Sequence, residues 1–229
     1  MAAVAARSPF PAPLLVLDAG APRPSAAVAL AGELLGEASA PGGPSAPPPV
    51  ALASRALAAA GLAPGDLGGV VAVRGPGSFT GLRLGLATAW ALHAALGIPA
   101  TAIPSFEALA RQLGPEGSPA LALVDALRGE WFAQLLATTP EVRPLSSPER
   151  LPASALAGLG ARTAIGFALE PLALSLPGVR LVAAAPLAPA GARQLSLEAP
   201  AWDPTLLLQP LYLRAPTRET RLGADAPAA

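Results

Sequence analysis

Residues 70–109 read VVAVRGPGSFTGLRLGLATAWALHAALGIPATAIPSFEAL, and this stretch decides the fold. Its pattern predicts a buried strand over 69–74, a Gly/Pro turn, a long apolar helix over 80–96, a second strand over 100–103 and another helix from Ser105. Two strands separated by a helix indicate a parallel β-α-β unit. The sequence therefore predicts an α/β fold.

The turn of this unit, GPGSFTG over 75–81, lies where a β-α-β unit can hold an anion. Backbone N–H groups in a glycine-rich turn, followed by a helix N-terminus, suit a phosphate. It is not a Walker loop, because the chain contains no lysine. By itself such a turn favours a connection that binds nothing. The residues that a phosphate would meet are Asp18, Gly75, Gly77, Ser78, Thr80 and Gly81.

Four segments together resemble the bacterial TsaB (YeaZ) family, the dimerisation subunit of the tRNA threonylcarbamoyladenosine machinery. They are VLDAG (16–20), GPGSFTGLRLGLATAWALHAALGIPA (75–100), LVDALRGEWF (123–132) and LYLR (211–214). The resemblance implies an actin-like ATPase fold (ASKHA, ribonuclease H-like) with two lobes, each a mixed sheet flanked by helices. It also implies that the chain is a degenerate paralogue of the catalytic subunit, TsaD.

The resemblance further implies that the chemistry of TsaD is missing here. Ser105 and Leu109 stand where TsaD has two metal-binding histidines, so we expect no metal site. The family usually reads Asp-Thr-Ser at its first turn, whereas Asp18 is followed by Ala-Gly-Ala at 19–21. Asp18 is then either a turn-forming carboxylate or a remnant of a phosphate site. We expect no catalytic residue and no cofactor.

Two predicted helices, over 50–60 and 80–96, carry almost only apolar or small side chains. Because a sheet covers one face of each helix, we expect a partner's helices to cover the other face. The four candidates in the second helix recur at helical spacing and include an aromatic anchor. Trp90 could instead belong to the core beneath the second lobe. The candidate interface residues are Leu52, Arg55, Arg83, Ala87, Trp90 and Ala94.

The composition excludes several classes of function. A net charge of +0 argues against strong direct binding of RNA. The absence of cysteine excludes disulfides and thiolate chemistry. The single histidine, His93, cannot form a His-Glu-x-x-His zinc site, and we expect it to be packed and hydrogen-bonded. No apolar run is long enough to span a membrane and no signal peptide is evident, so we expect a cytoplasmic protein.

The chain is predicted to have four parts: a disordered extension over 1–12, a first lobe over 13–104 with the dimerisation helices, a second lobe over 105–214, and a disordered tail over 215–229. The region over 140–209 carries no motif. The further elements that we expect are strands over 14–18, 26–30, 34–38, 120–125, 131–138, 162–166 and 179–182, a helix over 146–159 and a loop over 186–197.

We therefore expect a non-catalytic dimerisation and activating subunit. It would pair with TsaD, so that TsaD transfers a threonylcarbamoyl group to the adenosine 3′ of the tRNA anticodon. The other implied partners are the ATPase TsaE and, through the complex, tRNA; alone, the chain could form a homodimer. The alternative is an autonomous nucleotide-binding enzyme of the actin-like fold, an ATPase or kinase. A metallopeptidase is disfavoured, because the chain has too few metal ligands.

Overall fold

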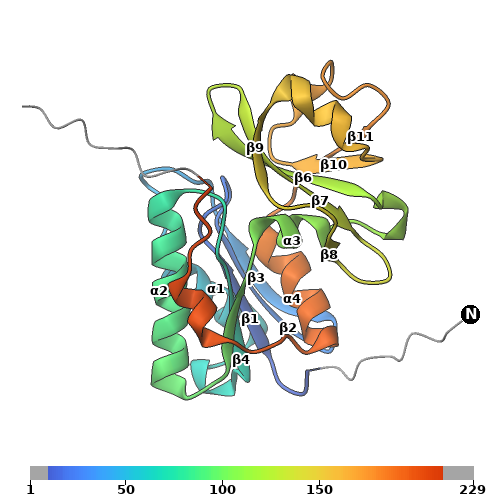
Figure 1. Ribbon diagram of the computed structural model, residues 1–229. Helices are drawn as coiled ribbons and strands as arrows, with labels where there is room; N and C mark the ends of the chain where they lie inside the picture. Colours follow the sequence, from blue (N-terminus) through green and yellow to red (C-terminus); the bar gives the residue numbers. More distant parts are fainter. Residues whose placement is uncertain (1–9, 214–229) are drawn as a thin grey trace, which may run out of the picture.

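The first sheet of the computed structural model, which describes residues 10–213, contains five strands in the order β3-β2-β1-β4-β5 (Figure 1). An antiparallel meander is formed by β1 (Leu14–Asp18), β2 (Ser25–Leu30) and β3 (Glu33–Ser39). The strands β4 (Gly69–Val73) and β5 (Ala100–Ile103) continue the sheet in parallel with β1. The predicted β-α-β unit is therefore present.

Helices cover both faces of this sheet. Leu15 and Leu17 of β1 point into a core shared with α1 (Pro49–Ala60) and α2 (Phe79–Leu96). The alternate side chains of β1 point into a second core. That core is shared with α3 (Ser105–Ala110) and α4 (Leu187–Glu198). The two long apolar helices therefore lie together on one side of the first lobe.

The second sheet has six strands and repeats the order of the first, as β11-β10-β6-β7-β8 with β9 paired to β7. Antiparallel strands lie on one side of β6 and parallel strands on the other. This duplication confirms the predicted actin-like, two-lobe α/β fold. The strands are β6 (Ala120–Leu127), β7 (Glu130–Ala137), β8 (Arg143–Pro144), β9 (Glu149–Pro152), β10 (Thr163–Gly166) and β11 (Arg180–Ala183).

Short 3₁₀ helices connect these elements. They are η1 (Pro64–Asp66), η2 (Pro115–Gly117), η3 (Ala153–Leu159), η4 (Glu170–Leu172) and η5 (Pro204–Leu208). None of the helices within residues 10–213 combines the length and the apolar character that a membrane span requires.

Three local predictions were wrong. Between the strands predicted over 26–30 and 34–38, the sequence places the turn at Gly32 and Glu33, but the β2–β3 turn is centred on Ala31 and Gly32, both with positive φ. The predicted helix over 146–159 is β9 followed by η3, because Pro148 and Pro152 interrupt a helix there. The predicted loop over 186–197 is α4, whose Pro189 lies in the first turn, where a proline is tolerated.

The chain returns to the first lobe after the second sheet. α4 packs on β1 and β2, and η5 packs on β5 and α2. Residues 187–213 thus lie with the first sheet, although the predicted second lobe spans 105–214. Phe10 is buried near Trp202 and its N–H donates to the Ser196 carbonyl, so ordered structure begins before the predicted boundary at residue 13. The rest of the predicted extension and the predicted tail lie outside the described residues.

Candidate functional site

The outer face of α2 is exposed along the length of the helix. Ser78 caps the helix by accepting a hydrogen bond from the Gly81 N–H, and Gly97 ends it in a left-handed conformation. Its buried residues are Leu82, Gly85, Leu86 and Ala89, which face the sheet. On the opposite face, Phe79 is 53%, Leu84 50% and Trp90 38% exposed. An apolar helix with one open face is typical of a contact surface.

Five of the six candidate interface residues lie on exposed helix surface: Arg55, Arg83, Ala87, Trp90 and Ala94. The sixth was predicted wrongly. Leu52 is 0% exposed, because it lies on the face of α1 that packs against the sheet. It therefore cannot contact a partner. The neighbouring Val50 is 55% exposed and takes its place on the outer face of α1.

Trp90 is not a core residue. Its ring lies edge-on to the imidazole of His93, with 5.5 Å between the ring centroids. The Nδ1 atom of His93 is 2.7 Å from the Ile98 carbonyl oxygen, so this nitrogen carries the proton and donates it. His93 is therefore a packed, hydrogen-bonded residue that supports Trp90 from one side.

The sequence did not reveal a cluster of three side chains at the N-terminal end of α2. The guanidinium carbon of Arg83 lies 3.9 Å from the centre of the Phe79 ring, and Arg83 Nε donates to the Tyr212 hydroxyl at 3.1 Å. The rings of Phe79 and Tyr212 are 5.1 Å apart. Phe79 lies one turn before Arg83 on α2, so this cluster continues the exposed helix face that contains Trp90.

Tyr212 reaches α2 because the last described residues are held along the end of β4. The Leu211 N–H donates to the Arg74 carbonyl at 2.7 Å, and an Arg74 guanidinium nitrogen donates to the Gln209 carbonyl at 3.0 Å. In the sequence, residues 211–213 stand out only as part of the LYLR segment that supports the resemblance. The position of Tyr212 against α2 depends on the return of the chain to the first lobe, which no local pattern indicates.

The glycine-rich turn before α2 is closed by the β1–β2 turn. The Ser78 N–H, which a phosphate would need, donates to the Gly20 carbonyl at 2.8 Å. A Cβ atom on Gly77 would lie 2.6 Å from the Gly20 oxygen, and one on Gly81 would collide with the Ala19 oxygen. These glycines therefore permit close contact between two backbone segments.

Asp18 forms the turn that closes this region. Its Oδ1 accepts hydrogen bonds from the N–H groups of Gly20 at 2.9 Å and Ala21 at 3.3 Å. Its Oδ2 is buried and has no hydrogen-bond partner among residues 10–213. Burial raises the pKa of Asp18 to about 7, although the two backbone hydrogen bonds act in the opposite direction. The geometry is that of a turn-forming carboxylate.

Ser105 and Leu109, at which the resemblance implies the loss of two histidines, both make structural contacts. The Ser105 hydroxyl donates to the Pro76 carbonyl at 2.8 Å, and the Ser105 N–H donates to the Gly75 carbonyl at 2.7 Å. Leu109 is fully buried in the core. These contacts fix the start of α3 against the glycine-rich turn. Neither side chain offers a free metal ligand.

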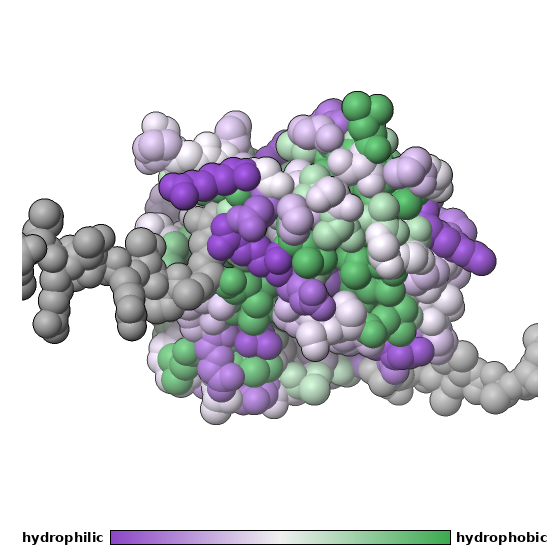
Figure 2. Space-filling model, turned by 45° about the horizontal axis from the view of Figure 1, so that its top comes forward, coloured by the Kyte–Doolittle hydropathy of each residue, from purple (hydrophilic) through white to green (hydrophobic). Residues whose placement is uncertain are grey.

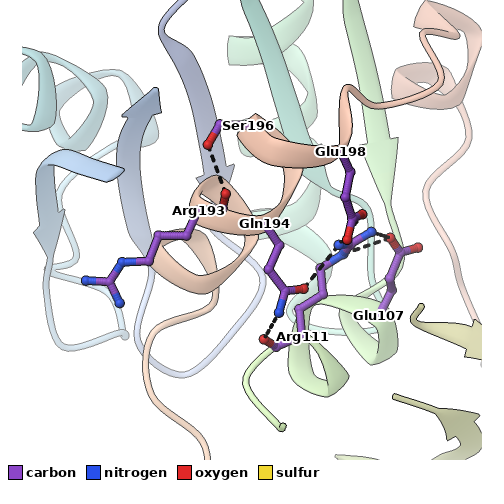
Figure 3. Close-up of polar contacts among 6 residues, drawn as sticks. All are labelled: Glu107, Arg111, Arg193, Gln194, Ser196 and Glu198. Carbon is purple, nitrogen blue, oxygen red and sulfur yellow. Dashed lines mark hydrogen bonds and ion pairs between the residues drawn. The ribbon is translucent and has the colours of Figure 1, made fainter. Parts of the chain in front are cut away.

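A polar cluster links α3 to α4 (Figure 3). Arg111 pairs with Glu107 at 2.8 Å and with Glu198 at 2.9 Å, and the Gln194 amide donates to the Arg111 carbonyl. Proximity to the two carboxylates raises the pKa of Arg111, although its burial acts in the opposite direction. Arg193 points away from this cluster. The cluster therefore holds the two helices together.

A cavity of about 620 Å³ lies beside this cluster, between β3, the connection from β11 to α4, and α4 itself. Its wall includes Glu37, Ser39, Arg111 and Arg193. None of the twelve predicted site residues lines it.

In the second lobe, Asp125 Oδ1 accepts the Leu127 N–H at 2.6 Å, so this carboxylate stabilises the β6–β7 turn.

Figure 2 shows the molecule obliquely, from a direction midway between the front and the top of the view in Figure 1. On this face the apolar residues are interspersed with hydrophilic ones and form no single continuous area. The outer face of α2 differs, because its exposed residues between 84 and 95 are Leu84, Ala87, Trp90, Ala91, Ala94 and Ala95.

Sequence comparisons match the chain to one family model and to several relatives. Residues 50–141 match the family model TsaD, tRNA N6-adenosine threonylcarbamoyltransferase. An uncharacterized protein of Mycobacterium tuberculosis is 36% identical over 167 residues, which covers 70% of this chain and 71% of that protein. The Bacillus subtilis tRNA threonylcarbamoyladenosine biosynthesis protein TsaB is 40% identical over 77 residues, 32% of either chain.

Two solved structures from Pseudomonas aeruginosa share the fold. YeaZ superimposes with a TM-score of 0.67 and 23% identity, covering 81% of this chain and 90% of that one. An uncharacterized protein with similarity to peptidase YeaZ gives a TM-score of 0.73 and 22% identity, covering 89% of this chain and 100% of that one.

Proposed function

The chain belongs to the TsaB (YeaZ) family, and from that premise we propose that it is a non-catalytic subunit that pairs with the catalytic subunit TsaD. In the pair, TsaD would transfer a threonylcarbamoyl group to the adenosine 3′ of the tRNA anticodon. This chain would hold TsaD in its competent state. TsaE would join the complex in the cytoplasm, and tRNA would be bound through the complex.

The observation that carries this proposal is the exposed apolar face of α2. Trp90 stands in the middle of this face with small alanines around it, and the Phe79, Arg83 and Tyr212 cluster stands at one end. Tryptophan, tyrosine and arginine are the residues that most often dominate binding energy at interfaces. Alanines allow a partner's helix to approach closely. This composition suits helix-to-helix contact with another protein.

The alternative, an autonomous ATPase or kinase, has the local geometry against it. The Ser78 N–H is bonded to the Gly20 carbonyl, and the hydroxyl residues that would follow Asp18 are absent. A nucleotide phosphate would have to separate two backbone segments that are now in direct contact. The glycine-rich turn therefore supports an interaction protein better than an enzyme.

Trp90→Glu tests the proposal. A charge in the middle of the apolar face should weaken binding to TsaD by at least about a hundredfold, because the carboxylate would be desolvated without a partner. The dissociation constant can be measured by isothermal titration calorimetry with purified TsaD from the same organism. Circular dichroism would establish that the variant remains folded.

Leu174→Glu is a matched control, because Leu174 is 96% exposed in the second lobe and far from α2 in the sequence. Its affinity for TsaD should equal that of the wild type. If the Trp90 variant and the wild type bind TsaD with equal affinity, the interface does not lie on α2.

A further inference from the structure

The strand β11 lies at one edge of the second sheet, and within residues 10–213 no strand pairs with its outer side. On its inner side, the Ala184 N–H donates to the Gly166 carbonyl of β10 at 2.8 Å. Successive residues of a strand turn their backbone groups to opposite sides, so Leu181 and Ala183 turn theirs away from β10. An edge of this kind can bind an added strand.

The next outward-facing residue, Ala185, already has a partner. Its N–H donates to Gln112 Oε1 at 2.9 Å, and Gln112 Nε2 donates to its carbonyl at 3.1 Å. One side-chain amide therefore occupies both backbone groups of Ala185, as a residue of a neighbouring strand would. A strand that pairs with the outer side of β11 has to end beside Gln112, because the edge is occupied from that point on.

The cavity of about 620 Å³ opens onto this edge. It is lined by Val182 and Ala183 of β11, by Gln112, and by Pro189 and Arg193 of α4. Cavities of about 300–1,000 Å³ are the usual size for bound ligands, so this one has room for the last residues of a peptide. Its wall thus combines unpaired strand backbone, small apolar side chains and one cationic group.

Arg193 lies near the point where an added strand would end. It lines the same cavity as Gln112, and the residues next to these two, Gln194 and Arg111, are joined by a hydrogen bond of 2.8 Å. The Arg193 side chain is exposed and points away from the polar cluster between α3 and α4 (Figure 3). It forms no ion pair in the part of the chain that the structure describes. A free guanidinium can bind a carboxylate through two hydrogen bonds.

A carboxylate is favoured only at this end of the edge. Glu37 of β3 lines another wall of the cavity and is exposed. It forms no ion pair with another residue between 10 and 213. Its negative charge disfavours acidic side chains along the rest of a bound segment.

We propose that the outer edge of β11 binds the C-terminal end of another polypeptide as an added parallel strand. The terminal carboxylate pairs with Arg193, and the residues before it carry no acidic side chain. The site lies beside α4, which covers the face of the first sheet opposite to α1 and α2. The inference therefore goes beyond the proposed pairing with TsaD and does not depend on it.

A library of random peptides displayed with free carboxyl ends provides the probe. Peptides selected on the full chain should lose at least about tenfold in affinity when the terminal carboxylate is converted to an amide, because the pair with Arg193 is lost. Arg193→Glu should weaken binding of the free-carboxylate peptides at least as much. Fluorescence polarisation of the labelled synthetic peptides measures both effects.

Arg143→Glu is the matched control, because Arg143 is an exposed arginine on β8, at the other edge of the second sheet. It should bind the selected peptides as the wild type does.

Ala183→Pro tests the strand pairing separately. Proline removes the outward-facing N–H of this residue, whereas the hydrogen bonds from β11 to β10 use other residues. The variant should bind the selected peptides at least about fivefold more weakly, the effect of one lost hydrogen bond. Ala183→Val keeps the N–H and should bind as the wild type does. Circular dichroism would establish that both variants remain folded.

The inference is overturned if no peptide is enriched on the wild-type chain relative to the Arg193→Glu variant. It is also overturned if the selected peptides bind equally well as amides, or bind Ala183→Pro as tightly as the wild type. A wild-type chain that dimerises in analytical ultracentrifugation, and that Ala183→Pro converts to a monomer, would place a second copy at this edge and would contradict the proposal as well. The affinity of Trp90→Glu for TsaD tests the other proposal independently.

Discussion

The carboxyl group of Asp18 makes stability depend on pH. Burial raises its pKa to about 7 in the folded state, whereas an unfolded aspartate titrates near about 3.9. Between these values the folded state binds more protons than the unfolded state. The contribution of this group to the free energy of unfolding is therefore fully present below about pH 4 and falls as the pH rises to about 7.

Asp18→Asn separates this effect from the others. The amide oxygen can still accept the Gly20 and Ala21 hydrogen bonds, but the side chain cannot ionise. We expect the variant to exceed the wild type in free energy of unfolding by about 1–3 kcal/mol at pH 8, and by less at pH 5. Urea denaturation at both pH values measures the difference. A difference that is the same at both would show that Asp18 does not titrate in this range.

Individual residues were predictable where a short motif fixed their surroundings. For Asp18, the loss of the hydroxyls after it left two roles open, a turn former or a remnant of a phosphate site, and its hydrogen bonds to Gly20 and Ala21 favour the turn former. The sequence could not decide whether Trp90 lies in the core or on the surface, because an indole in an apolar helix suits either place. Leu52 was assigned to the wrong face of α1. Nearly every residue of α1 is apolar, so the sequence does not indicate which of them face the sheet.

Among the elements, α2 and the segment that follows η5 act together. Tyr212 lies over Phe79 and accepts a hydrogen bond from Arg83, so the end of the described chain widens the surface of the helix. Tyr212 is 40% exposed, which leaves part of its ring available to a partner.

Tyr212→Ala should therefore weaken binding to TsaD by about tenfold, because the exposed ring is lost and Arg83 is released. The free energy of unfolding should fall by no more than about 1.5 kcal/mol, the range for one aromatic pair. Tyr212→Phe keeps the ring and loses only the hydrogen bond, so its effect should be smaller. Leu208→Ala, at a residue 65% exposed in η5, serves as the control. Unchanged affinity of the alanine variant would limit the interface to the helices.

The elements of the first lobe could be predicted closely, because alternating strands and helices there are bounded by glycine and proline. The strand over 100–103 has the predicted ends. The elements after residue 140 were the least predictable. The helix α4 contains Pro189 and Gly191 in its first six positions, and these two residue types have the lowest helix propensities. Packing against β1 and β2 outweighs that propensity.

At the scale of the molecule, the two lobes repeat one strand order but present different surfaces. The first lobe carries the α1 and α2 surface, and the last part of the chain returns to it and adds Tyr212. The resemblance in sequence predicted the duplicated fold. It did not predict the return of the chain, because contacts between segments that are more than a hundred residues apart leave no local pattern.

Hydrogen–deuterium exchange of the whole chain, with and without TsaD, tests the central claim most directly. The account predicts slower exchange on complex formation within α2 (Phe79–Leu96) and α1 (Pro49–Ala60), with the second sheet unchanged. Protection confined to the second lobe or to the cavity beside α4, with α1 and α2 exchanging as in the free chain, would contradict it.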